Sequence, residues 1–289
     1  MRSLMFVPGQ RQKMLDKAVT LALDVALFDL EDGVPPAEKE TARDLTSRIL
    51  GREPGGPTRY VRINAMGTPW VDEDLERIVR PGLAGILLPK ADRSDDVARL
   101  EQRLDALETA AGLRRGSVRV IAAIESAMGL QSASEIARAS PRIAGLMFGA
   151  EDFAKDLGLP IVRRAEAAEL AYARSAMVVA AAAANVGAFD GVWPDIRDAE
   201  GLRRDTLQAR RLGFTGKSLI HPGQIETINE IFSPTAEEVD YALRVVAAFE
   251  EAQARGEGAI AFGGQLIDLP IVERARRTLR MHEVLAARA

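Results

Sequence analysis

Short runs of aliphatic and β-branched residues alternate along the chain with longer amphipathic stretches that are rich in Ala, Glu and Arg. This alternation is typical of a parallel sheet whose strands are joined by crossover helices. We count eight such units. The predicted strands are Ser3–Val7, Val25–Leu30, Arg59–Ile63, Gly85–Pro89, Arg119–Ile124, Gly145–Phe148, Phe189–Trp193 and Gly216–Ile220.

Helical patterns fill the segments between these strands, and many of them begin with Ser, Thr, Asp or Pro, which are common helix-start residues. The predicted helices lie near residues 10–23, 37–50, 69–79, 94–111, 129–139, 163–186, 198–212 and 222–231. Eight β-α units in this length favour an α/β fold of the TIM (β/α)8 barrel type over an open doubly wound sheet. No dinucleotide-binding glycine fingerprint follows the first strand, which weakens the open-sheet alternative.

The chain continues beyond the eighth unit, with helical patterns near 235–255 and 270–286 and a short apolar run, Ala259–Phe262, between them. The glycines that flank this run are Gly256, Gly258, Gly263 and Gly264. Glycine hinges around a short apolar run suit a mobile lid. We therefore predict a barrel over residues 1–232 and an appended C-terminal helical lid segment over 233–289, which covers its own barrel or that of a neighbouring subunit.

Composition narrows the classes of function. The 289 residues, 47% of them hydrophobic, are enough for a large core. The 38 basic and 42 acidic residues are spread along the chain, which argues against nucleic acid as a partner. The absence of cysteine excludes disulfides, thiolate zinc sites and a cysteine nucleophile, and fits a reducing compartment. Residues 1–9 are too short for a signal peptide and no apolar run reaches 18 residues, so we expect a cytoplasmic protein without a membrane span.

Charged and polar residues gather where the apolar strand runs end. In a (β/α)8 barrel the C-terminal ends of the strands share one face, and that face carries the active site. We therefore expect these side chains to meet at one mouth. They are Glu31 and Asp32 after the second strand, Arg62 and Asn64 at the third, Lys90 at the fourth, Glu125 at the fifth, Glu151 and Asp152 after the sixth, Asp195 after the seventh and His221 after the eighth.

Some of these residues have a structural explanation that competes with a functional one. Glu31 and Asp32 could serve a turn or a helix cap, and His221 precedes a proline, as helix-start residues often do. Glu125 and Asp152 point more strongly to a metal, because a carboxylate directly after an apolar strand is costly unless it is paired or bound to a cation. A site of carboxylates without Cys or nearby His ligands selects Mg²⁺, or Mn²⁺ in its place, rather than zinc.

Arg62 adds the second part of the predicted chemistry. Its planar guanidinium suits a carboxylate or an enolate oxygen, and a 2-oxo acid is a natural bidentate ligand for an open magnesium site. Breaking a carbon–carbon bond β to a thioester leaves an enolate, which a cation and a guanidinium stabilise. The residues thus favour enolate chemistry.

An ordered set of motifs over nearly the whole chain resembles the citrate lyase β-chain group, within the larger family of 2,4-dihydroxyheptenedioate aldolases, malyl-CoA lyases and malyl-CoA thioesterases. Each motif alone is modest, but the ordered set is highly specific. The matching stretches are Arg2–Gly9, Asp29–Val34 with Lys39, Ala42 and Arg43, Val61–Asn64, Leu88–Lys90, Ile124–Gly129, Phe148–Phe153, Asp156–Gly158, Asp190–Val192, Gly216–Pro222 and Gly264–Pro270.

The resemblance implies a TIM barrel that assembles as a homotrimer or hexamer and holds Mg²⁺ on Glu125 and Asp152. It implies that Arg62 binds substrate with Asn64 beside it, and that Glu31 and Asp32 lie close to the metal and its waters. Asp268 matches an aspartate that acts as a base in the mouth of the next subunit. Contacts to CoA would come from the loop around Arg11 and Lys13 and from the region Lys217 to His221.

The activity that the resemblance implies is a retro-aldol lyase reaction, in which a citryl-, malyl- or citramalyl-CoA is cleaved to, or formed from, a 2-oxo acid and an acyl-CoA. Three alternatives stay open at this point. They are an acyl-CoA thioesterase on the same site, a β subunit that depends on an acyl-carrier partner, and a pyruvate aldolase that does not use CoA. The tail with Asp268 argues against the last.

Overall fold

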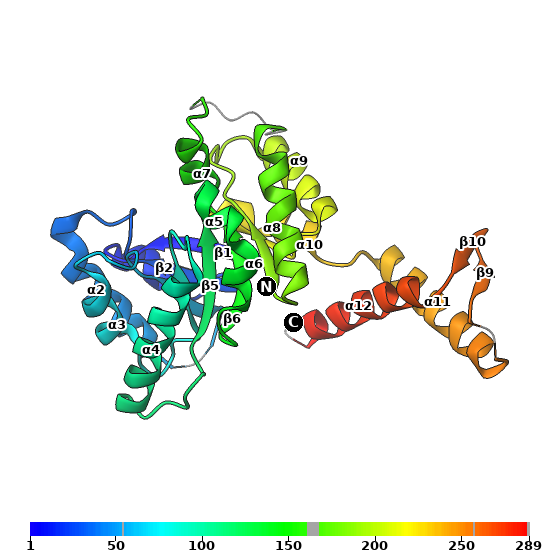
Figure 1. Cartoon of the computed structure of the whole chain (residues 1–289), viewed down its shortest axis with the longest axis horizontal. Helices are drawn as coiled ribbons and strands as arrows, with labels where there is room; N and C mark the ends of the chain where they lie inside the picture. Colours follow the sequence, from blue (N-terminus) through cyan, green and yellow to red (C-terminus); the bar gives the residue numbers. More distant parts are fainter. Residues whose placement is uncertain (54, 161–167, 257, 288–289) are drawn as a thin grey trace. The chain divides into compact units, whose positions relative to one another are not determined.

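The computed structural model describes residues 1–53, 55–160, 168–256 and 258–287, and the chain divides into two compact units, Met1–Asn229 and Glu230–Ala289. The first unit contains a closed barrel of eight parallel strands (Figure 1). Each strand pairs with the next along the chain, and β1 closes the ring by pairing with β8. The strands are β1 Ser3–Pro8, β2 Val25–Asp29, β3 Thr58–Arg62, β4 Gly85–Leu88, β5 Arg119–Ile124, β6 Ile143–Phe148, β7 Gly187–Asp190 and β8 Gly216–Leu219.

The interior of the barrel is a packed apolar core. Strands that are covered by helices outside and side chains inside bury both faces, which is why they read as continuous apolar runs in the sequence. The buried core residues include Leu4, Val25, Leu27, Tyr60, Leu87, Ile121, Ala123, Met147 and Phe189, drawn from seven of the eight strands. This core fixes the strand ends, and with them the side chains at the mouth.

Helices surround the strands of the first unit (Figure 1). They are α1 Gln12–Ala18, α2 Lys39–Leu50, α3 Val71–Ile78, α4 Ser94–Ala110, α5 Ala127–Gln131, α6 Ala133–Arg138, α7 Ala150–Asp156, α8 Ala171–Ala183, α9 Ala199–Leu212 and α10 Ile225–Phe232, with short 3-10 turns η1 Pro36–Glu38, η2 Ala168–Leu170 and η3 Pro222–Gln224. The barrel prediction is confirmed, and every predicted strand overlaps an observed one. Helix α7 was not predicted, and residues 163–167 of one predicted helix lie outside the described residues.

The second unit has a small apolar core of its own. Helices α11 Ala236–Ala254 and α12 Leu269–Ala286 pack on a hairpin of β9 Ile260–Phe262 and β10 Gln265–Ile267. The core residues are Ala242, Val245, Phe249, Ile267, Val272 and Ala275. Gly263 and Gly264 both have positive φ, at 57° and 79°, and form the tight turn of this hairpin. The glycine pair that the sequence suggested as a hinge is therefore a turn.

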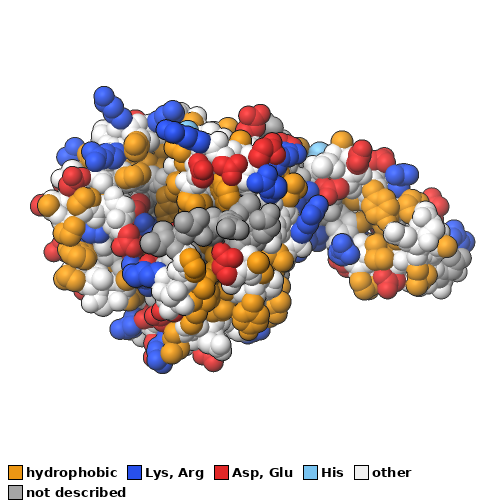
Figure 2. Space-filling view, turned by 90° about the horizontal axis from the view of Figure 1, so that it is seen from above, with side chains coloured by type: hydrophobic (Ala, Val, Ile, Leu, Met, Phe, Trp, Pro, Cys, Tyr) orange, Lys and Arg blue, Asp and Glu red, His pale blue; other side chains and the backbone are white. Residues whose placement is uncertain are grey.

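Two further features concern the surface. Within the described residues, every helix is too short or too polar to span a bilayer. On the face shown in Figure 2, basic and acidic side chains are interspersed, and the described residues of this face form no broad basic patch.

Candidate active site

A cavity of about 340 Å³ opens at the C-terminal ends of the barrel strands. It contains one arginine and four carboxylates, facing a largely apolar wall. Its lining residues are Phe6, Pro8, Asp29, Gly33, Arg62, Glu125, Met147, Phe148, Gly149, Ala150, Glu151, Asp152, Val192, Ser218 and Ile220. A larger hollow of about 910 Å³ lies over α2 and α3, but its Arg43 and Glu73 pair with one another there. The strand-end cavity is the one that brings Arg62, Glu125 and Asp152 of the predicted site together.

Arg62, at the end of β3, is held rigidly by two carboxylates from the end of β2. Its Nε and Nη2 donate to the two carboxylate oxygens of Asp29, both at 2.7 Å, and its Nη1 lies 3.0 Å from Glu31 Oε2. The guanidinium also lies over the ring of Phe6, 4.8 Å from its centroid. Burial opposes the charge, but the ion pairs with Asp29 and Glu31 outweigh it and raise the pKa of Arg62. A guanidinium has five N–H donors, of which two donate to Asp29, so N–H groups on both Nη1 and Nη2 remain for a ligand.

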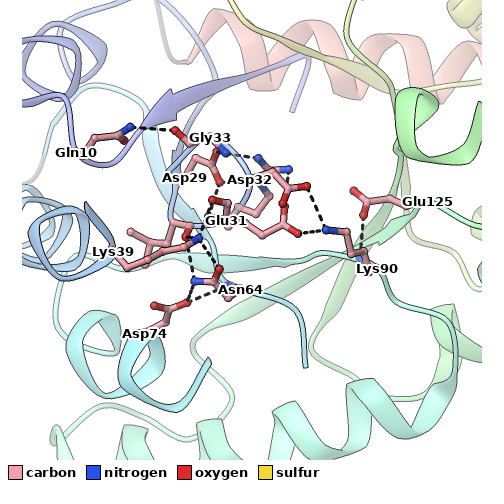
Figure 3. Close-up of polar contacts among 12 residues, drawn as sticks. Gln10, Asp29, Glu31, Asp32, Gly33, Lys39, Asn64, Asp74, Lys90 and Glu125 are labelled. Atoms are coloured by element: carbon pink, nitrogen blue, oxygen red, sulfur yellow. Dashed lines mark hydrogen bonds and ion pairs between the residues drawn. The ribbon is translucent and has the colours of Figure 1, made fainter. Parts of the chain in front are cut away.

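Glu31 and Asp32 form an acidic pair that Lys90 bridges (Figure 3). The Lys90 ammonium lies 2.5 Å from Glu31 Oε1 and 3.1 Å from Asp32 Oδ2. Glu31 is buried, whereas the Asp32 side chain is 59% exposed. Partial burial opposes the shift, but the hydrogen bond and charge of Lys90 lower the pKa of Asp32. The turn after β2 and Lys90 after β4 therefore form a charged triad at the rim of the mouth.

Lys90 also contacts the carboxylate at the end of β5. Its backbone N–H donates to Glu125 Oε2 at 3.0 Å, and its φ of 49° lies in the left-handed region that disfavours residues other than glycine. One strained residue thus touches both Glu125 and the acidic pair.

Glu125 and Asp152 are the predicted metal ligands, and both line the cavity. Burial, with the negative charges of Glu31 and Asp152, raises the pKa of Glu125 to about 7. A Cβ on Gly149 would come within 2.3 Å of Glu125 Cγ, so this glycine leaves room for the carboxylate. The described residues hold no cluster of three or more His, Cys, Asp or Glu side chains arranged for a metal. Magnesium commonly takes only one or two carboxylates and completes its shell with water or substrate, so this pair fits it.

A buried network supports the acidic turn from below (Figure 3). The Lys39 ammonium donates to the carbonyls of Leu30 and Glu31, at 2.6 and 2.8 Å, and to Asn64 Oδ1 at 2.6 Å. Burial lowers the pKa of Lys39, although the neighbouring carboxylates, led by Asp74, oppose that shift. The Asn64 amide in turn donates to Asp74 and to the Leu30 carbonyl. The structure thus uses both ends of the Asn64 amide in this network, and Asn64 does not line the cavity.

Other predicted contacts lie away from the cavity lining. Arg11 and Lys13 are exposed residues at the start of α1, and His221 is an exposed residue whose Nδ1 accepts from Gly223 N–H and so caps η3. Asp268, in the second unit, is the N-cap residue of α12, but no capping hydrogen bond to its side chain is found among the described residues. Its carboxylate is therefore not committed to that role.

The expected contact of Lys217 with CoA is wrong, because this side chain is buried between the strands and helices α8 and α9 and does not line the cavity. Its ammonium lies 2.6 Å from Asp190 and 2.6 Å from Asp205, and Arg174 pairs with the same two carboxylates. Burial opposes ionisation of Asp190, but Lys217 and Arg174 hold its pKa below the ordinary value. This buried ion cluster of Arg174, Asp190, Asp205 and Lys217 braces β7, β8, α8 and α9.

One residue of the site, Asp29, was not among the predicted site residues, although it is the carboxylate that holds Arg62. Lys90 was expected at the mouth as a charge at a strand end, but no role was predicted for it. The available signal for Asp29 was its position inside a buried strand, where an unpaired carboxylate is costly.

Comparisons with family models, with known proteins and with solved structures all point to one family. Residues 2–222 match the family described as HpcH/HpaI aldolase/citrate lyase. The chain is 40% identical over 281 residues to the citrate lyase subunit beta of Leuconostoc mesenteroides subsp. cremoris, covering 97% of this chain and 92% of that protein. It is 38% identical over 287 residues to a (3S)-malyl-CoA thioesterase of Cereibacter sphaeroides, covering 99% and 96%. Among solved structures it is similar to the protein CitE from Mycobacterium tuberculosis in complex with magnesium, acetoacetate and coenzyme A, with a TM-score of 0.79, 35% identity and 97% of each chain covered.

Proposed function

The chain belongs to the HpcH/HpaI aldolase/citrate lyase family, and on that premise we propose that it is a magnesium-dependent carbon–carbon lyase. Its substrate is a 3-hydroxy carboxylic acyl-CoA, which it cleaves to a 2-oxo acid and an acyl-CoA or forms from them. The observation that carries the proposal is the convergence of Arg62, Glu125 and Asp152 on one cavity at the strand ends. The complex of the Mycobacterium tuberculosis relative with magnesium, acetoacetate and coenzyme A supports this assignment.

Glu125 and Asp152 would hold the magnesium ion, which supplies a Lewis acid for the oxygens of the bound oxo or hydroxy acid. Burial and neighbouring carboxylates disfavour the negative charge of Glu125, so a cation beside this carboxylate would stabilise its ionised form. Lys90 fixes one oxygen of this carboxylate through its backbone N–H.

Arg62 stabilises the negative charge that develops on the substrate. In the cleavage direction the 3-hydroxyl group gives its proton to a carboxylate of the site. The carbon–carbon bond between the hydroxyl-bearing carbon and the carbon next to the thioester breaks, and its electron pair moves into the thioester enolate. The remaining N–H groups of Arg62 face this charge, and Asp29 and Glu31 hold the guanidinium plane so that little reorganisation is needed.

Asp268 is proposed to deliver the proton to the enolate carbon, or to remove it in the condensing direction, from a second copy of the chain in a homotrimer or hexamer. The support is its uncommitted carboxylate at the start of α12. We further propose that Glu31 and Asp32 act near the metal waters, and that Arg11, Lys13 and His221 contact the CoA moiety or substrate from the exposed rim. All three side chains of this last group are exposed.

A second candidate is hydrolysis of the thioester on the same site, since the Cereibacter sphaeroides relative is named as a thioesterase. A third is a β subunit that acts with an acyl-carrier partner, as the name of the Leuconostoc relative suggests.

One experiment separates the three. Purified protein is incubated with malyl-, citramalyl- and citryl-CoA, with Mg²⁺ or with EDTA, while 2-oxo acid and free thiol are followed in parallel. Mg²⁺-dependent release of 2-oxo acid without free thiol is the expected result. Free thiol would favour the thioesterase, and no reaction on any thioester despite binding of Mg²⁺ and a 2-oxo acid would favour the partner-dependent subunit.

Asp268→Asn tests the proposed division of roles. It should abolish turnover and leave binding of the 2-oxo acid intact, with Asp240→Asn, at an exposed residue of α11 in the second unit, as the matched control. Loss of 2-oxo acid binding in Asp268→Asn would contradict the assignment.

A further inference from the structure

Lys90 contacts the candidate metal ligand Glu125 with its backbone and the acidic pair with its side chain (Figure 3). Resting on the proposed magnesium site, we propose that the Lys90 ammonium is a built-in cation, which takes the place of a second divalent metal ion on the acidic pair of Glu31 and Asp32. The mouth of the barrel therefore holds a single metal ion, and the lysine supplies the second positive centre. Removal of this one charge converts the mouth into a site for two metal ions.

The acidic pair offers the same kinds of ligand as the candidate magnesium site. Each consists of one glutamate and one aspartate, which are Glu31 and Asp32 in the first and Glu125 and Asp152 in the second. The two are close together, because Lys90 contacts both and because the charge of Glu31 helps to raise the pKa of Glu125. Hard divalent cations bind such carboxylates, and sites with two metal ions place them about 3.5–4 Å apart. The carboxylates alone would therefore suit two ions.

The ammonium contacts the acidic pair as a bridging cation would. Lys90 Nζ lies 2.5 Å from Glu31 Oε1 and 3.1 Å from Asp32 Oδ2. The other oxygen of Glu31, Oε2, is buried and accepts no hydrogen bond from the described residues, although Arg62 Nη1 lies 3.0 Å away. Since Arg62 is also bound to Asp29, loss of the ammonium leaves the buried Glu31 carboxylate short of positive charge. Such a carboxylate is costly unless another cation replaces the lost one.

The backbone of Lys90 holds the ammonium in this place. Its φ of 49° is a conformation that residues other than glycine adopt at a cost. The Lys90 N–H donates to Glu125 Oε2 at 3.0 Å, and the N–H of Ala91 donates to the Ala123 carbonyl at 3.1 Å, so the turn is fixed on both sides of the strained residue. Strain of this kind clusters at functional sites, which points to a role for Lys90 in the site itself. Its side chain is 39% exposed, so ions from solvent can reach the place that it occupies.

Counting bound Mn²⁺ tests this role, because Mn²⁺ takes the same oxygen ligands as Mg²⁺ and its electron paramagnetic resonance responds to a second ion nearby. The full chain is dialysed against MnCl2. The unsubstituted protein and Lys90→Arg, which keeps a cation at this position, should bind a single ion per chain. Lys90→Met should bind a second ion, with a dissociation constant within about a hundredfold of the first. The two neighbouring ions should broaden each other's resonance.

Two further variants tie the result to the acidic pair. Lys90→Gly also removes the charge and adopts the positive φ freely, so it should bind the second ion even if Lys90→Met does not fold. Lys90→Met/Asp32→Asn lacks one of the two carboxylates and should return to a single ion.

A single ion in both Lys90→Met and Lys90→Gly would overturn the inference and leave the magnesium site standing. A second ion without magnetic coupling would do the same, since it would lie elsewhere, and so would a second coupled ion in the unsubstituted protein or in Lys90→Arg. Absence of bound Mn²⁺ from every protein would overturn the inference and the magnesium site together. Since none of these measurements needs turnover, failure of the lyase activity is seen separately, in the thioester assay.

Discussion

Replacing Lys217 by Met should cost the protein about 3–5 kcal/mol of unfolding free energy, the range for breaking a buried ion pair by removing one partner. In the buried ion cluster, Arg174 and Lys217 balance Asp190 and Asp205, and none of the four side chains is more than 6% exposed. Lys217→Met keeps most of the side-chain volume but leaves two carboxylates with one guanidinium. Since natural domains have only about 5–15 kcal/mol of total stability, this is a large fraction of it.

The measurement is urea unfolding of the full chain followed by circular dichroism, with the shift of the midpoint compared among matched variants. Lys217→Met/Asp205→Asn restores the charge balance and should recover at least half of the loss. Arg99→Met removes an exposed partner of Asp96, a pair at 2.6 Å on the surface, and should change stability by less than about 1 kcal/mol. If Lys217→Met costs no more than Arg99→Met, or if the double variant is less stable than Lys217→Met, the argument from charge balance is refuted.

Lys90→Gly should be more stable than Lys90→Ala by about 1 kcal/mol, because φ at this position is 49° and glycine adopts it freely; both should lower thioester cleavage, and equal denaturation midpoints would count against strain here. Glu125→Gln should abolish Mg²⁺ binding in a calorimetric titration, whereas a dissociation constant like that of the unsubstituted protein would rule out this ligand. Burial raises the pKa of Glu108, but hydrogen bonds from Arg142 and from backbone N–H groups outweigh burial and lower this pKa from the ordinary 4.5 to about 2. This depressed pKa contributes up to about 3 kcal/mol above pH 4.5 that is lost as the pH falls toward 2, and Glu108→Gln should flatten that acid limb of the stability curve.

The fold follows from the sequence because its strands are apolar on both faces. The apolar run Val120–Ile124, for example, lies between Arg119 and Glu125, so its limits are visible without any tertiary contact. Helix α7 was missed because it is only seven residues long and has two acidic residues in its first turn, which were interpreted as a cluster of charges at a strand end. Local patterns do not distinguish a short helix from a loop that carries site residues.

The sequence predicted which end of the barrel carries the candidate site, but not which side chains pair with one another there. Glu31, Arg62 and Glu125 follow apolar strands and do meet at the mouth. Asn64 carries the same signal, a polar residue after a strand, and Lys217 is the second residue of β8, yet the side chains of both belong to buried networks. Whether such a side chain points into the cavity or into a buried network depends on partners in other elements, such as Asp205 for Lys217. One sequence does not reveal these partners.

Closure of the barrel has a consequence for association between chains. Every barrel strand is paired on both sides, so the first unit offers no free row of backbone N–H and C=O groups to another sheet. In the described part of the chain, the open edges belong to the hairpin of β9 and β10, whose strands are three residues long. Strand addition by a second chain would thus have to begin at this short hairpin, where the exposed Leu266 is the apolar contact available to it. A polar residue at position 266 is accordingly the change that would most directly protect the protein from sheet-mediated aggregation.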